Sequence, residues 1–340
     1  MNKNFWNNQS RPIVGLSPMD GFTDSAYRHV CKELNPDIIV FTEFTSAEGL
    51  AHDAEKIKAR FQYDPMEQPI IAQIFGSDIS SFVYAAQWLE ERGFAGIDIN
   101  MGCPSRKVVK SECGIALRKH HDLAFRLVDA VVKNTNLPVS IKTRLGLTDA
   151  SDLITFGEGC ENAGANLITI HGRTYDEPYG VPARFEQIYE LKRALSIPVL
   201  ANGGIASRTD GNRKLGNLDG FLIGQAAIGN PWVFAPNPNG VSNAGFAERL
   251  ERPFSEKIPV ILRHAELLVE YKGPVYGIRE MRKHLLAYVK GLPDARLYRS
   301  WLAQTTDLAM LRGTLERIVE TAGSPVVEHV AVPTIASSWG

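Results

Sequence analysis

The stretch Gly96-Ile97-Asp98-Ile99-Asn100-Met101-Gly102-Cys103-Pro104 carries the strongest indication of the fold. Its first half is an apolar run of strand length, and its second half passes through Asn100 and Gly102 to a cysteine before a proline. Buried parallel strands are apolar nearly throughout, and barrel enzymes place reactive side chains where such strands end. We therefore predict a buried strand that presents Cys103 at the mouth of a site. A cysteine taken alone is more often a small apolar core residue. The residues around Cys103 are therefore needed to choose between a reactive thiol and a core residue.

Seven more apolar runs of this kind alternate with segments that have helical periodicity. Eight consecutive strand–helix units predict an α/β fold, a (β/α)8 TIM barrel, although a doubly wound open sheet would give a similar rhythm. Asn100, Lys142, His171 and Asn202 lie at or beside the carboxyl ends of different runs, which favours the barrel. The expected strands are 13–17, 38–42, 69–75, 96–100, 138–143, 166–171, 198–202 and 219–224, with helices over 24–34, 80–92, 122–134, 183–195 and 208–215.

The strand–helix pattern stops after Trp232, where Pro, Asn and Gly become frequent. Such composition is typical of a linker. Helical spacing of apolar residues then returns, which predicts a small helical bundle at the C-terminal end. We expect a barrel domain over 1–235, a linker over 236–256, a helical domain over 257–321 and a loose tail over 322–340.

Composition restricts the class of protein. The 340 residues include 37 basic and 38 acidic side chains, so no strong overall charge attracts nucleic acid or membrane, and a polyanion would have to be bound by local patches. The four cysteines contain no C-x-x-C pair, which indicates a reducing compartment and argues against a metal site. The N-terminal residues lack the apolar core of a signal peptide, and no run reaches membrane-spanning length. We expect a cytoplasmic protein without a membrane partner.

The motifs at the strand ends resemble those of the dihydrouridine synthases, flavin enzymes that reduce uridine in tRNA. The resemblance covers most of the chain. Near the C-terminus, Arg282-Lys283-His284-Leu285 and Lys290-Gly291-Leu292-Pro293 are most similar to the bacterial B-type subgroup. The barrel motifs are Leu16-Ser17-Pro18-Met19-Asp20-Gly21-Phe22-Thr23-Asp24, Thr42-Glu43-Phe44, Gln73-Ile74-Phe75-Gly76, Asn100-Met101-Gly102-Cys103-Pro104, Ile141-Lys142-Thr143-Arg144-Leu145-Gly146, His171-Gly172-Arg173-Thr174, Ala201-Asn202-Gly203-Gly204-Ile205 and Gly224-Gln225-Ala226-Ala227-Ile228-Gly229-Asn230-Pro231.

The resemblance implies FMN as cofactor and NADPH as reductant. A reduced flavin carries negative charge at its N1/O2 edge, and Lys142 at a strand end can stabilise that charge. Gln73 can form hydrogen bonds with the pyrimidine edge of the flavin, while Pro18 and Met19 can pack against the ring. Without their neighbours, Gln73 and Met19 would be ordinary packing residues, and Lys142 a surface lysine.

The phosphate of the cofactor is expected at the glycine turns after the last two strands, where barrels usually bind phosphate. These turns contain Gly203-Gly204 and Gly224, with Asn202 and Gln225 beside them. Two glycine turns are weak evidence alone. The family usually has arginine at the position of Gln225, so one charged contact is expected to be missing. His171, which could be a core histidine, is expected to contact the flavin or its phosphate side.

The resemblance assigns hydride delivery to reduced FMN and proton donation to Cys103. A thiol with an ordinary pKa of about 8.5 is protonated at neutral pH and can act as a general acid. The loop over 105–119 is expected to close over the substrate. It contains a second thiol, Cys113, which we interpret as incidental.

The partner implied by the resemblance is tRNA, whose target uridine has to leave its stack to reach the barrel. Basic residues exceed acidic ones in the C-terminal helices and in the loop that follows Cys103, where Glu112 stands against Arg106, Lys107, Lys110, Arg118 and Lys119. Charge runs of this kind usually form solvated helix faces, so the interpretation depends on the barrel evidence. We expect a monomer. The predicted substrate and tRNA contacts are Asn100, Arg106, Lys107, Arg144, Arg173, Arg279, Arg282 and Lys283.

Two other functions remain open at this point. The first is a flavin barrel that acts on a free pyrimidine, against which the basic C-terminal helices argue. The second is a tRNA-binding relative without catalytic activity, suggested only by Gln225. A yellow colour of the purified protein would separate a flavoprotein from the second alternative.

Overall fold

A computed structural model describes residues 4–235 and 252–323 of the chain. It divides into two compact units, 1–252 and 253–340, which we describe separately. Most of the predicted linker and tail lies outside the described residues. The first helix of the second unit begins at Phe254, within the stretch predicted as linker.

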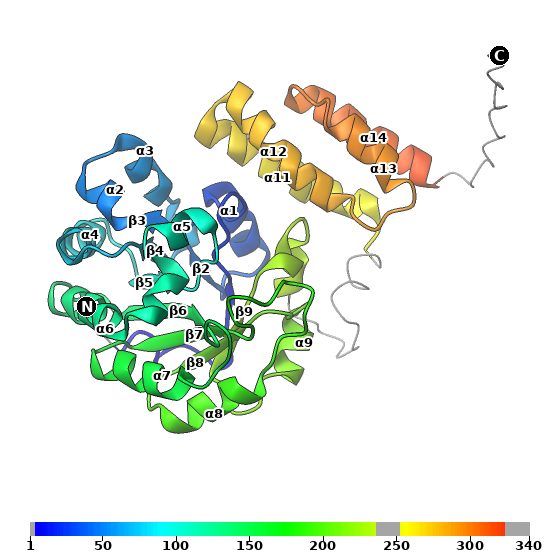
Figure 1. Cartoon of the computed structure of the whole chain (residues 1–340). Helices are drawn as coiled ribbons and strands as arrows, with labels where there is room; N and C mark the ends of the chain where they lie inside the picture. Colours follow the sequence, from blue (N-terminus) through cyan, green and yellow to red (C-terminus); the bar gives the residue numbers. More distant parts are fainter. Residues whose placement is uncertain (1–3, 236–251, 324–340) are drawn as a thin grey trace, which may run out of the picture. The chain divides into compact units, whose positions relative to one another are not determined.

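The first unit is a closed parallel barrel, as predicted (Figure 1). Neighbouring strands are all parallel, and the barrel closes where Ile13 pairs with Gly220 and where Val40 pairs with Ile70. All eight predicted strands are present. The barrel strands are β1 (Ile13–Leu16), β2 (Ile39–Phe41), β4 (Ile70–Phe75), β5 (Gly96–Met101), β6 (Val139–Arg144), β7 (Leu167–His171), β8 (Val199–Asn202) and β9 (Gly220–Ile223); the two-residue β3 (Thr45–Ser46) pairs with the end of β4.

Helices surround the barrel on its outside (Figure 1). Several begin at residues whose side chains accept a hydrogen bond from the first turn, as Asp24 and Asp78 do for α1 and α4. Such caps satisfy amide groups that have no partner within the helix. The helices of this unit are α1 (Ser25–Leu34), α2 (Ala47–Ala51), α3 (Glu55–Lys58), α4 (Ile79–Glu91), α5 (Arg106–Lys110), α6 (His121–Lys133), α7 (Leu153–Asn162), α8 (Glu186–Ala194) and α9 (Arg208–Arg213).

The strands are buried on both faces, which explains their continuous apolar sequence. The layer between strands and helices forms the largest hydrophobic cluster, whereas Ile13, Phe41, Ile71, Leu167 and Leu200 belong to a separate cluster with Trp6. Because the strands are parallel, their carboxyl ends all lie at one end of the barrel, and the polar strand-end residues meet there.

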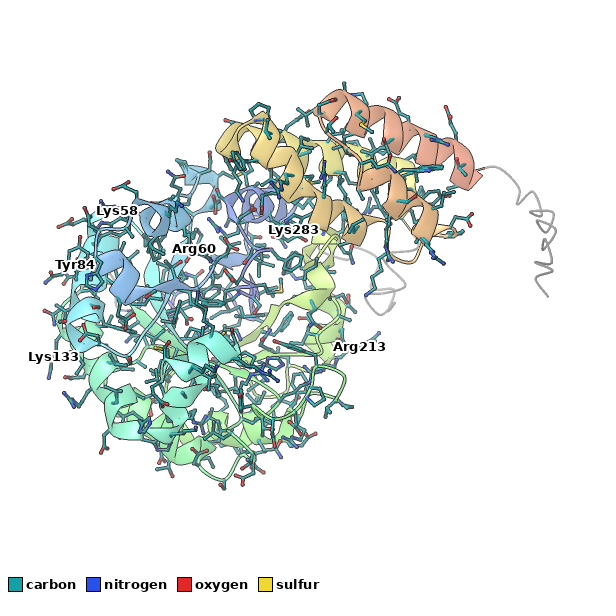
Figure 2. The ribbon with its side chains drawn as sticks, turned by 45° about the horizontal axis from the view of Figure 1, so that its top comes forward. Lys58, Arg60, Tyr84, Lys133, Arg213 and Lys283 are labelled. Carbon is teal, nitrogen blue, oxygen red and sulfur yellow. The ribbon has the colours of Figure 1, made fainter. Side chains whose placement is uncertain are left out.

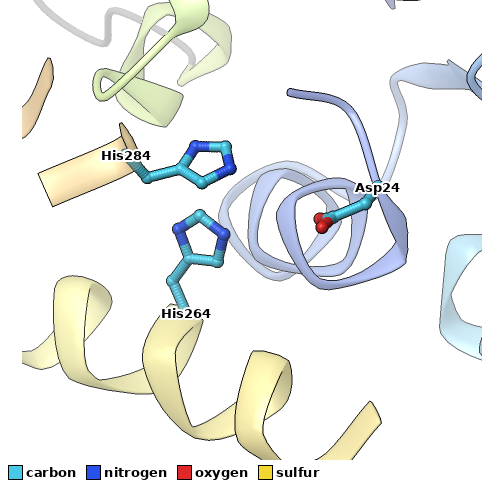
Figure 3. A group of neighbouring side chains, drawn as sticks. All are labelled: Asp24, His264 and His284. Atoms are coloured by element: carbon cyan, nitrogen blue, oxygen red, sulfur yellow. The ribbon is translucent and has the colours of Figure 1, made fainter. Parts of the chain in front are cut away.

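The second unit is a helical bundle, as predicted. Its helices are α11 (Phe254–Lys272), α12 (Pro274–Tyr288), α13 (Ala295–Leu302) and α14 (Leu308–Gly323). Ile261, Leu268, Leu285 and Leu302 are fully buried. The rings of His264 on α11 and His284 on α12 pack edge to face, with centroids 4.5 Å apart and planes at 65° (Figure 3). Within the two described ranges, no helix is long and apolar enough to cross a membrane.

Candidate active site

A cavity of about 540 Å³ opens at the carboxyl ends of β1, β6, β7, β8 and β9. Nine of the ten predicted cofactor residues line it, and Arg173 from the predicted RNA contacts lines it too. The exception is Gln73. The nine residues are Pro18, Met19, Lys142, His171, Asn202, Gly203, Gly204, Gly224 and Gln225.

The turn after β8 leaves room for a ligand because it consists of two glycines. Gly203 and Gly204 have φ angles of 98° and 62°, which other residues rarely adopt. A Cβ on Gly203 would lie 2.6 Å from the His171 ring, so a side chain there would collide with the cavity wall. Asn202 is held beside the turn by a hydrogen bond from its Nδ2 to the Leu222 carbonyl, 2.9 Å away. The turn thus has the open backbone that a phosphate site requires.

Lys142 places a positive charge in this cavity. Burial, followed by the nearby Arg144, lowers the pKa of Lys142 from 10.5 to about 8. Its ammonium group forms neither an ion pair nor a hydrogen bond with any residue that the structure describes. Lys142 and Arg173 line the cavity, and no Asp or Glu of the described part of the chain does; the buried Asp98, outside the lining, acts on Lys142 in the opposite direction to burial. Cations without carboxylate partners favour an anionic ligand at this position.

His171 is a neutral member of the site. Its pKa is lowered to about 2, chiefly by burial and then by Lys142, Arg144 and Arg173. The Arg173 guanidinium lies 2.9 Å from His171 Nε2. Because a guanidinium can only donate, Nε2 must accept, and the ring proton is therefore on Nδ1. His171 can offer one N–H to a ligand without adding charge.

The turn that carries Cys103 is organised by Asn100. The Oδ1 of Asn100 accepts hydrogen bonds from the backbone N–H groups of Gly102 and Cys103, at 3.1 and 2.9 Å. Gly102 lies against β6, where an added Cβ would be 3.1 Å from the Thr143 Cα, so a larger residue would require the turn or β6 to shift. Asn100 therefore holds the backbone of the turn, while presentation of the Cys103 thiol to the cavity stays a prediction, since Cys103 is not among its lining residues.

Gln73 lies beneath this turn and connects it to the barrel interior. It is fully buried; its Nε2 donates to Asp98 at 2.7 Å, and its Oε1 accepts from Asn100 at 3.0 Å. Ser140 donates to the other carboxylate oxygen of Asp98 at 2.6 Å. Burial raises the pKa of Asp98 to about 6. Contact of Gln73 with flavin therefore stays a prediction, and the contacts found here are those of a residue that orients Asn100.

Cys103 is almost buried, with an exposed fraction of 9%. Burial raises its pKa above the ordinary value, and the opposing effects of Lys142 and Arg144 are smaller. The thiol is therefore protonated at neutral pH, as a proton donor requires. Cys113 is buried too, with its Sγ 3.7 Å from the Ser77 hydroxyl, and it lines a different cavity from the one that contains Lys142.

The residues predicted to contact RNA are of two kinds in the barrel unit. Arg106 and Lys107 on α5 are exposed. Arg144 is buried; its Nε donates to the Gly102 carbonyl at 3.0 Å and its Nη1 to the Thr174 carbonyl at 2.9 Å. Arg144 therefore joins the Cys103 turn to the loop after β7. Arg118, counted with the basic loop, is likewise buried and paired with Asp152.

The three basic residues predicted on α12 also differ from one another. Arg282 donates twice to the Thr305 carbonyl, at 3.1 and 2.9 Å, and so holds the connection between α13 and α14. Lys283, labelled in Figure 2, pairs with Glu280 at 2.6 Å. Arg279 is exposed and has no ion-pair or hydrogen-bond partner among the described residues. Arg279 is consequently the best placed of the three for RNA.

Sequence reasoning missed Tyr179. It lines the cavity from the loop after β7, with its ring centroid 5.9 Å from that of His171 and 5.6 Å from the Arg144 guanidinium carbon. Nothing in the sequence between β7 and α8 distinguishes this tyrosine from a surface residue. Ser17 and Phe22 were also missed, although they belong to the quoted motif around Pro18 and Met19.

The cavity fits a flavin mononucleotide on two observations. A Cβ on Gly203 would collide with the His171 ring, so the turn has room only without a side chain, and the Lys142 ammonium forms no ion pair with any described residue, although the buried Asp98 partly offsets the lowering of its pKa. A phosphate at the turn and the N1/O2 edge of a flavin at Lys142 would meet these two requirements.

A family model described as Dihydrouridine synthase (Dus) matches residues 15–322. The chain belongs to the dihydrouridine synthase family. It is 34% identical over 296 residues to tRNA-dihydrouridine synthase B of Pseudomonas aeruginosa, covering 86% of this chain and 88% of that protein. It is 33% identical over 327 residues to tRNA-dihydrouridine synthase B of Xanthomonas campestris, covering 94% and 97%. The resemblance predicted from the motifs is confirmed, and this dihydrouridine synthase family member is an oxidoreductase, as expected.

Proposed function

We propose that this protein reduces a uridine of tRNA to 5,6-dihydrouridine, with FMN as its cofactor and NADPH as the reductant. The observation that carries the proposal is the protonated thiol of Cys103 at the end of β5, close enough to Lys142 in the cavity wall for each group to affect the pKa of the other. Its relatives are named for tRNA, and the same substrate is proposed here. We also propose that it acts in the cytoplasm as a monomer without a metal.

The residues around the cavity have distinct proposed roles. Gly203, Gly204, Gly224 and Gln225 would hold the phosphate, and Lys142 would neutralise the edge of the reduced flavin. His171 would donate a hydrogen bond from Nδ1. Pro18 and Met19 would pack against the ring. Bound FMN, once reduced by NADPH, supplies the hydride for one carbon of the uracil double bond.

The proton for the other carbon would come from Cys103. Its raised pKa keeps the proton on Sγ until a substrate carbon accepts it. Asn100 fixes the backbone of the turn through two amide hydrogen bonds, so the thiol has a defined position. Arg144 connects this turn to the loop that carries Arg173 and Tyr179 through hydrogen bonds to the Gly102 and Thr174 carbonyls, and this connection supports a fixed distance between the thiol and the cavity.

Purification of the full chain and analysis of tRNA test the proposal. The expected result is a protein that binds FMN non-covalently, and tRNA that lacks dihydrouridine at one position in a deletion strain and regains it when the gene is restored. A protein that shows no flavin spectrum after incubation with excess FMN, or tRNA unchanged by the deletion, would contradict the proposal.

A further inference from the structure

A second cavity, of about 650 Å³, opens at the same end of the barrel among the segments that follow β2, β4 and β5. Its volume is in the range of sites for small organic ligands. None of its lining residues belongs to the cavity with Lys142. The wall toward the proposed active site is the loop that begins at Cys103, because Ser105, Val108 and Cys113 line the second cavity.

The apolar part of this cavity is an aromatic pair. Phe44 and Phe75 are half-buried, with ring centroids 5.3 Å apart and planes at 75°. Both rings pack against the buried cluster formed by Cys103, Val108 and Cys113. They therefore present flat apolar surface to the cavity directly beside the proposed proton donor. Nucleobases of every kind stack on such surfaces.

The polar part leaves one cation available. Asp20 is paired with Arg60 (labelled in Figure 2). Glu48 accepts hydrogen bonds from the backbone N–H groups of Ser77 and Asp78, at 2.7 and 3.1 Å. Lys107 is exposed at the rim, and no described residue forms an ion pair with it. A phosphate that reached this rim would find a free ammonium group and carboxylates that are already engaged.

We propose that the second cavity binds the base of the nucleotide next to the reduced uridine, with Lys107 on the intervening phosphate. This inference rests on the proposed function, since it takes RNA as the substrate. A uridine within reach of the Cys103 thiol would have its neighbour close to Phe44 and Phe75, because these rings pack against the small buried cluster that contains Cys103. The site would accept any base that is unstacked from its neighbours, and so would favour loops over helices.

Binding of short RNA tests the proposal without requiring turnover. The ligand is the pentamer A-A-U-A-A, whose single uridine fixes the register, together with versions that lack the base 5′ or 3′ of the uridine. Dissociation constants are measured with the flavin-loaded protein and with Phe75→Leu. Removal of one of the two bases should weaken binding to the wild-type protein about 5- to 150-fold, the range for stacking of one base on an aromatic side chain.

The decisive quantity is the coupling free energy between deletion of the base and loss of the Phe75 ring. It is the difference between the effect of Phe75→Leu on binding of the intact pentamer and its effect on binding of the base-deleted pentamer. Phe75→Leu should weaken binding of the intact pentamer, yet the base-deleted pentamer should bind wild type and Phe75→Leu almost equally. Lys107→Ala gives a second cycle in case Phe75→Leu fails to fold, and Lys110→Ala on the same helix is its matched control. We expect coupling for Lys107 and none for Lys110.

The inference would be overturned if the base deletion and the protein substitution had additive effects on the binding free energy. This would have to hold for Phe75→Leu and for Lys107→Ala, and for the 5′ as well as the 3′ base. That result differs from failure of the proposed function, which would appear as tRNA whose dihydrouridine content is unchanged by deletion of the gene, while the binding cycle could still be measured.

Discussion

The Lys142 ammonium should lower the free energy of unfolding of the flavin-free protein and raise the affinity of the protein for the cofactor. Burial lowers the pKa of Lys142 from 10.5 to about 8. The unfolded chain therefore binds more protons between these values, and the free energy of unfolding rises with pH across that window. Below pH 8 the whole penalty is present. At about 1.36 kcal/mol per pKa unit, it amounts to about 3 kcal/mol at most.

Lys142→Met removes the charge and keeps a side chain of similar length. We expect the flavin-free variant to be more stable than wild type at pH 7, by up to about 3 kcal/mol, and to lose the rise in stability above pH 8. The assay is urea denaturation of flavin-free protein between pH 7 and 10. Lys133→Met is the matched control, since Lys133 is an exposed lysine on α6 (Figure 2), with 70% of its side chain accessible.

The same variant should bind reduced flavin more weakly. Loss of a charge-assisted hydrogen bond costs about 1.5–3 kcal/mol, or roughly 10- to 150-fold in affinity. If only the reduced form loses this contact, the two-electron potential falls by about 30–65 mV. Wild-type affinity for reduced flavin should also decrease as pH rises above 8, where Lys142 loses its proton. A flavin-free Lys142→Met protein that is less stable than wild type at pH 7, with an unchanged potential when loaded, would refute this reasoning.

Three other changes follow from the contacts described above. Asp98→Asn removes the carboxylate that accepts hydrogen bonds from Gln73 and Ser140. It should slow flavin reoxidation by tRNA more than flavin reduction by NADPH, both measured by stopped-flow absorbance, whereas equal slowing of both steps would show general damage. Gln225→Arg should tighten FMN binding by about 1–3 kcal/mol, measured by fluorescence titration, and no change would place the phosphate elsewhere. Arg279→Glu should weaken tRNA binding and lower its dependence on salt concentration, whereas unchanged affinity would move the RNA surface away from α12.

The strands could be predicted from sequence because burial on both faces leaves a continuous apolar run. The run predicted over 96–100 became the strand Gly96–Met101, for example. Strand-end residues such as Lys142, His171 and Asn202 were also predictable, since a parallel barrel brings all carboxyl ends to one side. The position of a residue on its strand was enough to place it.

Residues whose position depends on distant loops could not be predicted. Tyr179 reaches the cavity because the loop after β7 folds back over Arg144, and no local pattern specifies that path. The basic residues Arg118 and Arg144 were expected to face RNA, but backbone carbonyls and Asp152 hold them inside the protein. Sequence shows that a side chain is charged, whereas its partners are found only in the folded chain.

The most direct test of the account is the rate at which tRNA reoxidises the NADPH-reduced enzyme in a single turnover, compared between Cys103→Ala and Cys113→Ala. Cys103→Ala should still fold, bind FMN and be reduced by NADPH, yet reoxidise with tRNA slower by about two orders of magnitude or more, the usual contribution of a general acid. Cys113→Ala should keep most of the wild-type rate, because its thiol lines the second cavity. An unchanged rate in Cys103→Ala together with a collapsed rate in Cys113→Ala would contradict the account and make Cys113 the proton donor.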